Sequence, residues 1–337
     1  MNMMKCKRQS KCILMYVLII GILWSGSAVW KIARNTLTTN TNCKNITKGL
    51  QQKFTASIAK IESIFHINSL HQQNNRSLSQ SNDFTILILV CSNPKNTHLR
   101  KAIRKTWLSM KHPTPNITIK YRFVIGNTDD NSIQENIKTE IDKFDDIVHG
   151  DFVDSYLNLT IKTLYAMKWA IFNEPNVNYV LKADDDAFIN IFNIPRFLYE
   201  KQLKRTCLGY MITNVPPDRN PASKWYVPKS SFPNPIYPAF TAGWAYVISM
   251  DMLPELYKTA KATNFFYLED IFLTGICRSK IKGKVMGNAN FKARLDSSND
   301  DEVKTFFAVH FTTEKNHYEY WKAQKRVGSH NLDGNEI

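Results

Sequence analysis

Several short motifs that identify common protein classes are missing from this sequence. No G-x-G-x-x-G and no G-x-x-x-x-G-K-[ST] occurs in the 337 residues, which disfavours a dinucleotide-binding fold and a P-loop. There is also no zinc-finger spacing and no block of five or six lysines and arginines. The net charge is +15, but the basic residues are scattered. We therefore expect no nucleic-acid partner and favour phosphorylated small molecules or a membrane surface.

Charged residues are absent from one long stretch, Ile13 to Trp30, whose length approaches the about 20 residues that span a bilayer. Four basic residues precede it, and only two follow closely. The positive-inside rule then predicts a cytoplasmic tail over residues 1–12, an uncleaved transmembrane signal anchor over 13–30, and a lumenal remainder. A cleaved signal peptide is the alternative, because residues 25–28 are small.

Residues 31–83 are rich in Asn, Gln, Ser and Thr, and we expect a lumenal stem that links membrane and domain. Inside it, isoleucines at helical spacing within residues 54–65 favour a short amphipathic helix. Four N-glycosylation acceptor patterns occur, at Asn45, Asn75, Asn116 and Asn158. Asn158 is the weakest of these, because it falls inside a predicted helix.

Four cysteines lie on the expected lumenal side, where disulfides can form: Cys43, Cys91, Cys207 and Cys277. Four cysteines allow three pairings, and their spacing does not choose among them. Cys91 lies in an apolar strand, so a buried free thiol is the alternative for it.

From residue 84 onward, short apolar strands alternate with amphipathic helices. Strands are predicted at 85–91, 117–125, 147–148 and 178–183, and helices at 99–110, 133–144 and 159–172. Further strands are predicted at 207–212, 224–227, 244–249 and 306–311, and helices at 251–262 and 318–326. This alternation predicts an α/β domain with a mostly parallel sheet over residues 84–330.

Three consecutive acids, Asp184, Asp185 and Asp186, follow directly on the predicted strand 178–183. Crowded carboxylates repel one another, and burial disfavours their charged forms. A divalent cation that prefers oxygen ligands, such as Mg²⁺ or Mn²⁺, would keep them ionised. Ligands of open α/β sheets bind beyond the carboxyl ends of the strands, so a metal-bound phosphate compound is expected here. A solvated acidic turn is the alternative.

Two later features also carry candidate chemistry. Glu269 and Asp270 open a predicted helix, where capping is the simpler interpretation because helix dipoles favour acids in the first turn. His310 lies in an apolar strand, where a lone histidine is more often a hydrogen-bonded core residue than a ligand.

Nine stretches occur together in one order: R-K-A-I-R-K-T-W (100–107), F-V-I-G (123–126), D-F-V-D-S-Y-L-N-L-T-I-K-T (151–163), K-W (168–169), Y-V-L-K-A-D-D-D-A-F-I-N (179–190), K-W-Y-V (224–227), Y-P-A-F-T-A-G (237–243), L-E-D-I-F-L-T-G-I-C (268–277) and V-H-F (309–311). In these the chain resembles the β-1,3-galactosyltransferases of glycosyltransferase family 31. That family also contains β-1,3-N-acetylglucosaminyltransferases and, more distantly, the Fringe proteins. The resemblance covers about residues 84 to 326.

The resemblance implies a GT-A fold, which is a Rossmann-like mixed sheet flanked by helices, in a single-pass type II protein of the Golgi membrane. It also implies an inverting, Mn²⁺-dependent transfer from a UDP-sugar, with UDP-galactose the first choice, to a glycan acceptor. By resemblance Asp186 is the direct metal ligand and His310 a distant second one. Asp184 and Asp185 would lie nearer the nucleotide and sugar hydroxyls, with Asp184 also a candidate metal ligand.

An inverting transferase needs one general base beside the acceptor hydroxyl. Asp270 is the favoured candidate and its neighbour Glu269 the alternative. Other candidate contacts stay open: Arg100, Arg104 and Lys162 either bind UDP phosphates or form surface ion pairs, and Trp225 and Trp244 either stack on acceptor sugars or pack in the core.

The expected function is galactosyl transfer in β-1,3 linkage to a glycoprotein or glycolipid. A β-1,3-N-acetylglucosaminyltransferase is one alternative, and a catalytically silent, lectin-like or chaperone-like lumenal relative is another. The sequence chooses neither the donor sugar nor the acceptor, and it leaves open whether the chain forms a homo-oligomer.

Overall fold

The computed structural model describes residues 40–72 and 84–332 of the chain. Residues 49–217 and 234–337 group into one compact unit, which carries the sheet. Residues 218–233 fall outside that unit and are described by themselves. The expected anchor at 13–30 and the sequon at Asn75 lie outside the described residues. Within the described ranges, no helix combines the length and apolarity that a membrane span requires.

The unit is built on a mixed, seven-stranded sheet with the order β3-β2-β1-β4-β7-β6-β8. These strands are β1 (Phe84–Cys91), β2 (Ile117–Asn127), β3 (Ile147–Val153), β4 (Tyr179–Asp184), β6 (Thr206–Ile212), β7 (Phe240–Ser249) and β8 (Lys284–Gly287). Only β7 runs against the others in this sheet. The expectation of an α/β domain with a mostly parallel sheet is therefore confirmed.

Strand β1 is an interior strand of the sheet, third in its order, and all eight of its residues are buried. A continuous apolar run is typical of a strand whose two faces are both covered by other elements. β1 pairs with β2 on one side and β4 on the other, which sets Cys91 beside Asp184. The residues that follow β1 and β4 consequently meet at one edge of the sheet.

A second, three-stranded sheet has the order β5-β10-β9. Its strands are short: β5 (Phe188–Ile189), β9 (Phe291–Lys292) and β10 (Ala308–Val309). Because β10 pairs antiparallel with β5, Val309 lies opposite Phe188. His310, the residue after β10, is thereby brought back to the three aspartates, which Ala187 separates from β5.

Four predicted helices are present with adjusted ends: α5 (Asn131–Phe144), α6 (Leu159–Asn173), α8 (Leu253–Lys261) and α11 (Glu314–Leu332). The helix predicted at 99–110 divides into α4 (Thr97–Lys105) and η1 (Trp107–Ser109), and the one opened by Glu269 continues as the π-helix η3 (Ile271–Cys277). Four short helices were not predicted: η2 (Tyr156–Asn158), α7 (Asn193–Lys201), α9 (Arg278–Lys280) and α10 (Asp300–Thr305). Local chemistry fixes some of these ends. At α5, for example, the Asp130 side chain caps the helix by accepting from the backbone N–H groups of Ser132 and Ile133.

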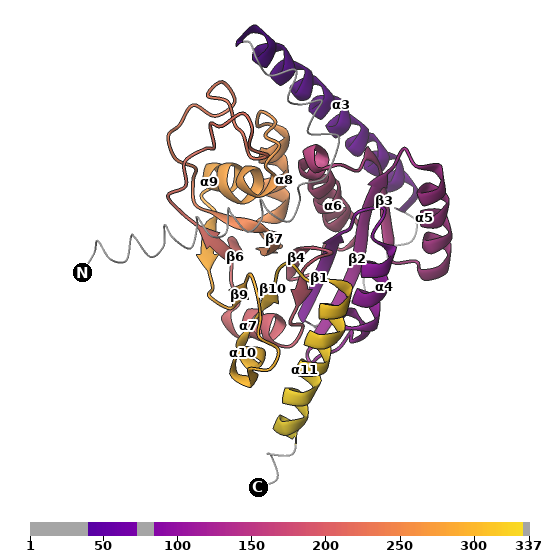
Figure 1. Cartoon of the computed structure of the whole chain (residues 1–337). Helices are drawn as coiled ribbons and strands as arrows, with labels where there is room; N and C mark the ends of the chain where they lie inside the picture. The colour runs from indigo at the N-terminus through magenta and orange to yellow at the C-terminus, as the bar shows by residue number, and fades with distance from the viewer. Residues whose placement is uncertain (1–39, 73–83, 333–337) are drawn as a thin grey trace, which may run out of the picture. The chain divides into compact units, whose positions relative to one another are not determined.

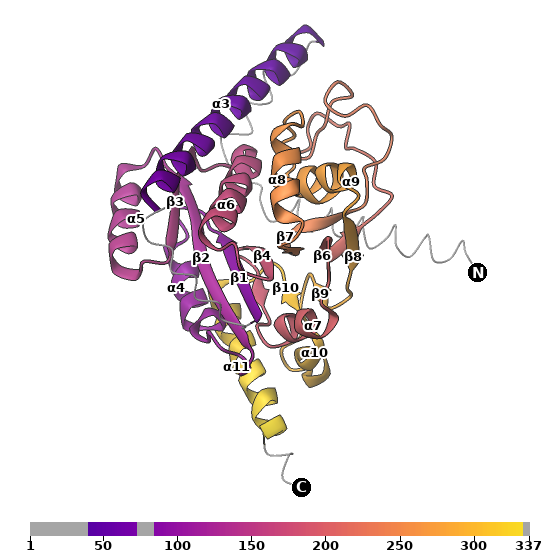
Figure 2. The same cartoon turned by 180° about the vertical axis from the view of Figure 1, so that it is seen from behind.

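Helix α3 (Asn40–Gln72) requires a correction to the expected stem. It is a 33-residue helix rather than a short one inside a linker, and Figure 1 and Figure 2 both show it running beside α6. Phe54, Ile61 and Phe65 are buried at 1, 4 and 3% exposure. Spacings of seven and four residues place these three side chains on one helix face. From Gly49 onward α3 belongs to the compact unit, so the unit begins well before residue 84.

One predicted strand is absent and another is shorter than expected, because apolar content alone does not supply a pairing partner along a whole segment. Residues 224–227 contain only an isolated bridge between Tyr226 and Asp218. The predicted strand 306–311 shortens to β10, and the prediction missed β5, β8 and β9 altogether.

The three sequons within the described residues lie in different surroundings. Asn116 is exposed in the turn before β2, whereas the Asn158 side-chain amide donates to the Val153 carbonyl at 2.8 Å. Asn158 stands at the N-terminal boundary of α6 rather than inside it. Asn45 lies in α3, and nothing is described of its side chain.

Among the described side chains, Cys91, Cys207 and Cys277 are buried free thiols, and burial raises the pKa of Cys91 to about 11.

Candidate active site

The three aspartates form a turn between β4 and β5, called here the aspartate turn (Asp184–Asp186). Its backbone is held on several sides. Ala187 N–H donates to the Asp184 carbonyl at 3.1 Å, and Thr312 N–H donates to the Asp186 carbonyl at 2.7 Å. The second bond comes from the segment after β10, so the small sheet fixes the turn against the large one.

His317 of α11 holds the middle of the turn. Trp107 can only donate through its indole nitrogen, which lies 3.3 Å from His317 Nδ1. The His317 proton is therefore on Nε2, which donates to the Asp185 carbonyl at 3.3 Å. Burial lowers the pKa of His317 to about 4, which keeps the ring neutral. The sequence prediction assigned no role to His317, because nothing near it in the chain marks it.

Asp185 faces the interior. Its Oδ2 accepts from Ser92 Oγ at 2.7 Å, Asn93 N at 3.0 Å and Asn96 Nδ2 at 2.9 Å, and the residue is 7% exposed. Burial raises the pKa of its carboxyl. Sequence analysis placed Asp185 near the nucleotide, but this oxygen is occupied by the loop after β1. Asp185 thus anchors the turn to β1.

The three basic residues expected at the phosphates form buried ion pairs. Arg100, with no exposed surface, binds Glu140 through two bonds of 2.9 and 2.6 Å and donates to Ser92 Oγ at 3.0 Å. Arg104 contacts Glu140 and Asp146 at 2.7 Å. Of the two alternatives, ion pairing describes these arginines, although the pairs lie in the interior and not on the surface. Arg100 supports Asp185 through the shared Ser92 hydroxyl.

Lys162 of α6 is also committed to protein groups. Its ammonium donates to the Ser92 carbonyl and to Asp154, both at 2.7 Å, and the residue is 2% exposed. Asp154 additionally accepts from Gly126 N–H at 2.8 Å. Lys162 therefore ties together the carboxyl ends of β1, β2 and β3, the edge at which the turn also lies.

Asp186 and His310 come together as the resemblance implied. His310 Nε2 lies 3.7 Å from Asp186 Oδ2, and the Asp186 side chain is 37% exposed. The His310 ring stacks on Trp244 with a centroid distance of 5.3 Å and an interplanar angle of 7°. Trp244 itself is 3% exposed, so it is an interior residue that orients His310. A stacking contact between Trp244 and a sugar is not supported by this position.

Asp184 lies beside Lys182, whose ammonium is 2.5 Å from Asp184 Oδ1 and 2.5 Å from the Gly243 carbonyl. Although burial opposes its charge, the carboxylates of Asp184 and Glu269 raise the pKa of Lys182 above its ordinary value. Lys182 belongs to the motif at residues 179–190, but no role was predicted for it. A lysine in a buried strand next to three acids was the available signal, since buried lysines are almost always paired.

The fit of these residues to a divalent metal can be judged from their chemistry. In residues 40–72 and 84–332, no group of three or more His, Cys, Asp and Glu side chains forms a ready metal cage. Two of the expected ligands, Asp186 and His310, are nevertheless adjacent. Loss of hydration, and then the charges of Asp184 and Asp185, raise the pKa of Asp186. A carboxylate and an imidazole at a site with excess negative charge suit Mn²⁺, so these residues fit the group.

Glu269 and Asp270, called here the acid pair, stand just before η3 in different surroundings. Glu269 is 6% exposed and accepts a 2.5 Å bond from the Tyr246 hydroxyl. Burial raises the pKa of Glu269 to about 7. Asp270 is partly exposed, and burial also raises its pKa. Its Oδ1 accepts from Ile271 N–H at 2.8 Å and its Oδ2 from Gly243 N–H at 3.1 Å.

Gly243 connects the acid pair to the aspartate turn. Its N–H group binds Asp270 and its carbonyl binds Lys182, which in turn binds Asp184. A β-carbon at this position would lie 3.3 Å from the Asp270 β-carbon, a closer contact than side chains normally make. Glycine permits the approach. The start of β7 therefore brings the two acidic groups to one site, as the antiparallel pairing of β7 with β4 requires.

Trp225, the other residue expected at an acceptor, lies in the separately described segment 218–233. There the Lys224 ammonium sits 4.9 Å from the centre of its indole ring. The acceptor role of Trp225 stays a prediction.

The chain is similar in sequence to several known proteins. The family model described as "Galactosyltransferase" matches residues 98–287, more than half of the chain. The chain is 35% identical to "Beta-1,3-galactosyltransferase 1" of Mus musculus over 209 residues, which cover 61% of this chain and 63% of that protein. It is 31% identical to "Beta-1,3-galactosyltransferase 2" of Homo sapiens over 264 residues, 74% of this chain and 61% of that protein.

The matched region thus spans about three fifths of the length of these curated relatives. Among solved structures, the WbbM bifunctional glycosyltransferase aligns with a TM-score of 0.41 and 8% identity, over 76% of this chain and 52% of that one. This likeness is distant.

Proposed function

Because the chain belongs to the galactosyltransferase family, we propose that it transfers a hexose, galactose in the first instance, from a UDP-sugar in β-1,3 linkage to a glycan acceptor. The domain would be of the GT-A type, in a type II Golgi membrane protein with its catalytic domain in the lumen. One observation carries the proposal. The aspartate turn, His310 and the acid pair, which are separated by up to 126 residues in the chain (310 − 184), meet at one edge of the sheet through β4, β7 and β10.

At this site Asp186 and His310 would hold Mn²⁺, with Asp184 beside them. When bound, the metal supplies a positive charge that stabilises the leaving diphosphate. Asp185 keeps the turn in place from the interior. The Lys182 ammonium neutralises the Asp184 carboxylate. Asp186 is then the carboxylate of the turn that faces outward, toward the metal.

Asp270 would act as the general base. A base works best when its pKa lies near the operating pH, and burial raises the pKa of Asp270 in that direction. The Gly243 N–H group orients the Asp270 carboxylate. Because Asp270 is partly exposed, its carboxylate stays accessible to an acceptor hydroxyl. Glu269 is sealed behind Tyr246 and is the weaker candidate. Asp270 would take the proton of the acceptor hydroxyl as its oxygen attacks the anomeric carbon of the donor sugar. The bond from that carbon to the diphosphate oxygen would break, UDP would leave with the bonding electron pair, and the configuration would invert.

The test is UDP release by the purified chain with UDP-galactose, UDP-N-acetylglucosamine and UDP-N-acetylgalactosamine, each with a panel of acceptor glycans, with and without Mn²⁺. Analysis of the product linkage identifies the bond. We expect Mn²⁺-dependent turnover with UDP-galactose and a β-1,3 product. If UDP-N-acetylglucosamine is the only donor that is turned over, the chain is an N-acetylglucosaminyltransferase instead. Absence of both turnover and UDP binding would support the catalytically silent relative instead.

A further inference from the structure

Helix α3 is seated on the unit that contains the site, although it lies before the region that matches the family. Two separate parts of the helix make contacts. The part from Lys60 to Phe65 meets β3, α6 and α8, and the part from Gln51 to Phe54 meets the segment that leads into the acid pair.

The Lys60–Phe65 part is a firm anchor. Glu62 accepts from Tyr257 and Lys261 at 2.8 Å and from Lys168 at 3.2 Å. Phe65 packs on Tyr165 and Phe172 of α6, with centroid distances of 5.7 and 5.6 Å. These contacts are all made to the outer helices.

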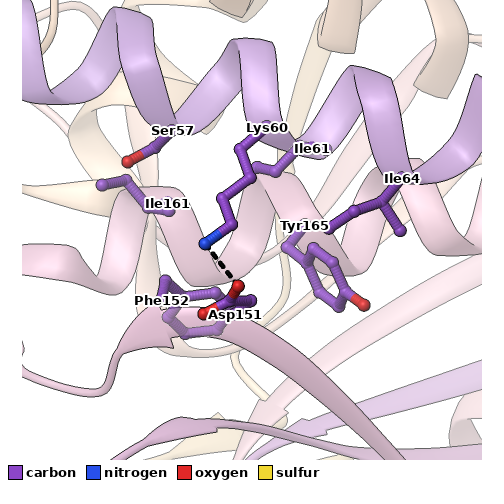
Figure 3. A pocket seen from close by; sticks show the side chains of 8 residues that line it. All are labelled: Ser57, Lys60, Ile61, Ile64, Asp151, Phe152, Ile161 and Tyr165. Carbon is purple, nitrogen blue, oxygen red and sulfur yellow. Dashed lines mark ion pairs between the residues drawn. The ribbon is translucent and has the colours of Figure 1, made fainter.

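The same anchor leaves little space beneath it. Figure 3 shows Lys60 of α3 pointing to Asp151 of β3, with which it forms an ion pair, above a small cavity. The volume of this cavity is ≈ 10 Å³, about enough for one water molecule. The cavity is a packing gap and holds no ligand-sized space.

The Gln51–Phe54 part touches a different structure. Gln51 Oε1 accepts from the Phe265 backbone N–H at 2.7 Å. The Phe54 ring lies 5.1 Å from the Phe265 ring and 6.3 Å, edge-on, from the Phe272 ring. Phe265 precedes the acid pair by four residues, and Phe272 follows Asp270 by two. Phe54 therefore contacts the chain on both sides of the catalytic candidate.

The segment 263–268 between α8 and the acid pair has no regular secondary structure. A segment without a ladder of backbone bonds takes its position from side-chain contacts. Two of these come from α3: the Gln51 bond to Phe265 and the packing of Phe54. Other elements add the Thr160 hydroxyl, which donates to the Phe266 carbonyl at 2.9 Å, the edge-on packing of Tyr237 on Phe266, and the Lys280 ammonium, which donates to the Thr263 hydroxyl at 2.9 Å. Beyond Asp270 the chain continues as the π-helix η3, a form often found at functional sites.

We propose that α3 is a positioning element for the proposed reaction: Gln51 and Phe54 hold residues 263–272 so that the Asp270 carboxylate stays aimed at the acceptor side. The inference rests on the proposed function for its kinetic consequences only. The structural consequence, a segment ordered by α3, can be measured without any turnover.

The chain offers matched controls. Phe65 is buried like Phe54 and lies on the same helix, but its ring contacts are with α6. Gln52 neighbours Gln51 and is exposed. We therefore compare Phe54→Ala with Phe65→Ala, and Gln51→Ala with Gln52→Ala, in the full chain. Phe54→Leu serves as the conservative variant that restores bulk.

Two measurements are made on each variant. Hydrogen exchange of residues 263–277 should rise in Phe54→Ala and Gln51→Ala, and stay at the wild-type level in Phe65→Ala and Gln52→Ala. In transfer assays, Phe54→Ala should lower kcat about 10-fold or more, since small misplacements of a catalytic group are costly, while UDP affinity changes less than about twofold. Phe54→Leu should recover most of the kcat.

The proposal is overturned if Phe54→Ala and Phe65→Ala lower kcat equally, or if exchange in 263–277 does not change in Phe54→Ala or Gln51→Ala. If Phe54→Ala fails to fold, the Gln51→Ala and Gln52→Ala pair decides by the same two readouts. A wild-type chain without turnover would overturn the proposed function, and the exchange comparison would then still support or reject the positioning role of α3.

Discussion

The aspartate turn is held through its backbone and through one inward acid, whereas the acid pair is held mainly by what surrounds it. Asp185 takes three hydrogen bonds from the loop after β1, and backbone bonds fix its neighbours. Glu269 and Asp270 depend on Tyr246, on Gly243 and on aromatic packing from a helix more than 200 residues earlier in the chain (269 − 54). Both regions are assembled from distant parts of the chain, the turn by the loop after β1 and by α11, the pair and its flanking residues by β7 and α3.

Both regions nevertheless divide adjacent acids in the same way. Asp185 and Glu269 are buried and bound to protein groups, while Asp186 and Asp270 keep exposed surface. Two neighbouring residues cannot both face the same direction at the start or end of a regular element. Asp185 and Glu269 are therefore structural, and their neighbours Asp186 and Asp270 are left for chemistry, which the following substitutions test.

The largest effect is expected from Asp186→Ala. Removal of this carboxylate should reduce Mn²⁺-dependent UDP binding at least about 100-fold, because metal–ligand charge stabilisation amounts to several kcal/mol. Isothermal titration calorimetry with and without Mn²⁺ measures the change. Asp142→Ala, at an exposed aspartate of α5, is the control and should bind like wild type. Wild-type binding by Asp186→Ala would contradict the metal assignment.

Asp270→Asn should come next, with kcat lowered by about 10²–10⁴-fold, the usual contribution of a general base. UDP affinity should change little, because the Asp270 carboxylate is held by the Gly243 and Ile271 N–H groups and is not one of the residues proposed to hold the metal. Steady-state kinetics alongside UDP titration separate the two quantities. Glu269→Gln is the paired variant and should lose less activity. If Glu269→Gln is the more damaging and Asp270→Asn stays active, the roles within the acid pair are reversed.

Lys182→Met tests the link between the two regions. It leaves Asp184 and Glu269 without their buried cation, and loss of one partner of a buried ion pair typically costs about 3–5 kcal/mol of unfolding free energy. Urea denaturation measures that loss. Lys120→Met removes the exposed Lys120–Glu174 pair and should cost less than about 1 kcal/mol. Equal losses in the two variants would show that Lys182 is no more than a surface-like charge.

The smallest effect is a pH dependence from His317. Its pKa is lowered from 6.5 to about 4, so between these pH values the unfolded chain binds a proton that the folded chain does not. The unfolding free energy therefore falls as pH drops from 6.5 to 4, by about 3 kcal/mol at most. Urea unfolding at pH 7 and pH 5 of wild type and His317→Gln measures the difference. If the unfolding free energy changes equally with pH in both chains, His317 is not the source of the pH dependence.

Much of the fold could be predicted from local pattern. The apolar runs and helical spacings located β1, β2, β4 and α6, because buried strands and amphipathic helices have distinct periodicities. The failures were the two-residue strands β5 and β9 and the short β8, where too few residues carry a pattern. For α3, the polar composition of the stem concealed three buried side chains on one face.

The sequence by itself determined which residues carry the chemistry: three acids after an apolar strand, a second acidic pair and a histidine, in the order that matches the galactosyltransferase family. Only the tertiary structure decided how each is used, because burial and partners depend on residues far along the chain. It turned Asp185 and Glu269 inward, gave Arg100, Arg104 and Lys162 to internal carboxylates, and brought His310 to within 3.7 Å of Asp186. It also placed α3, which local composition assigned to a linker, against the residues on either side of the acid pair.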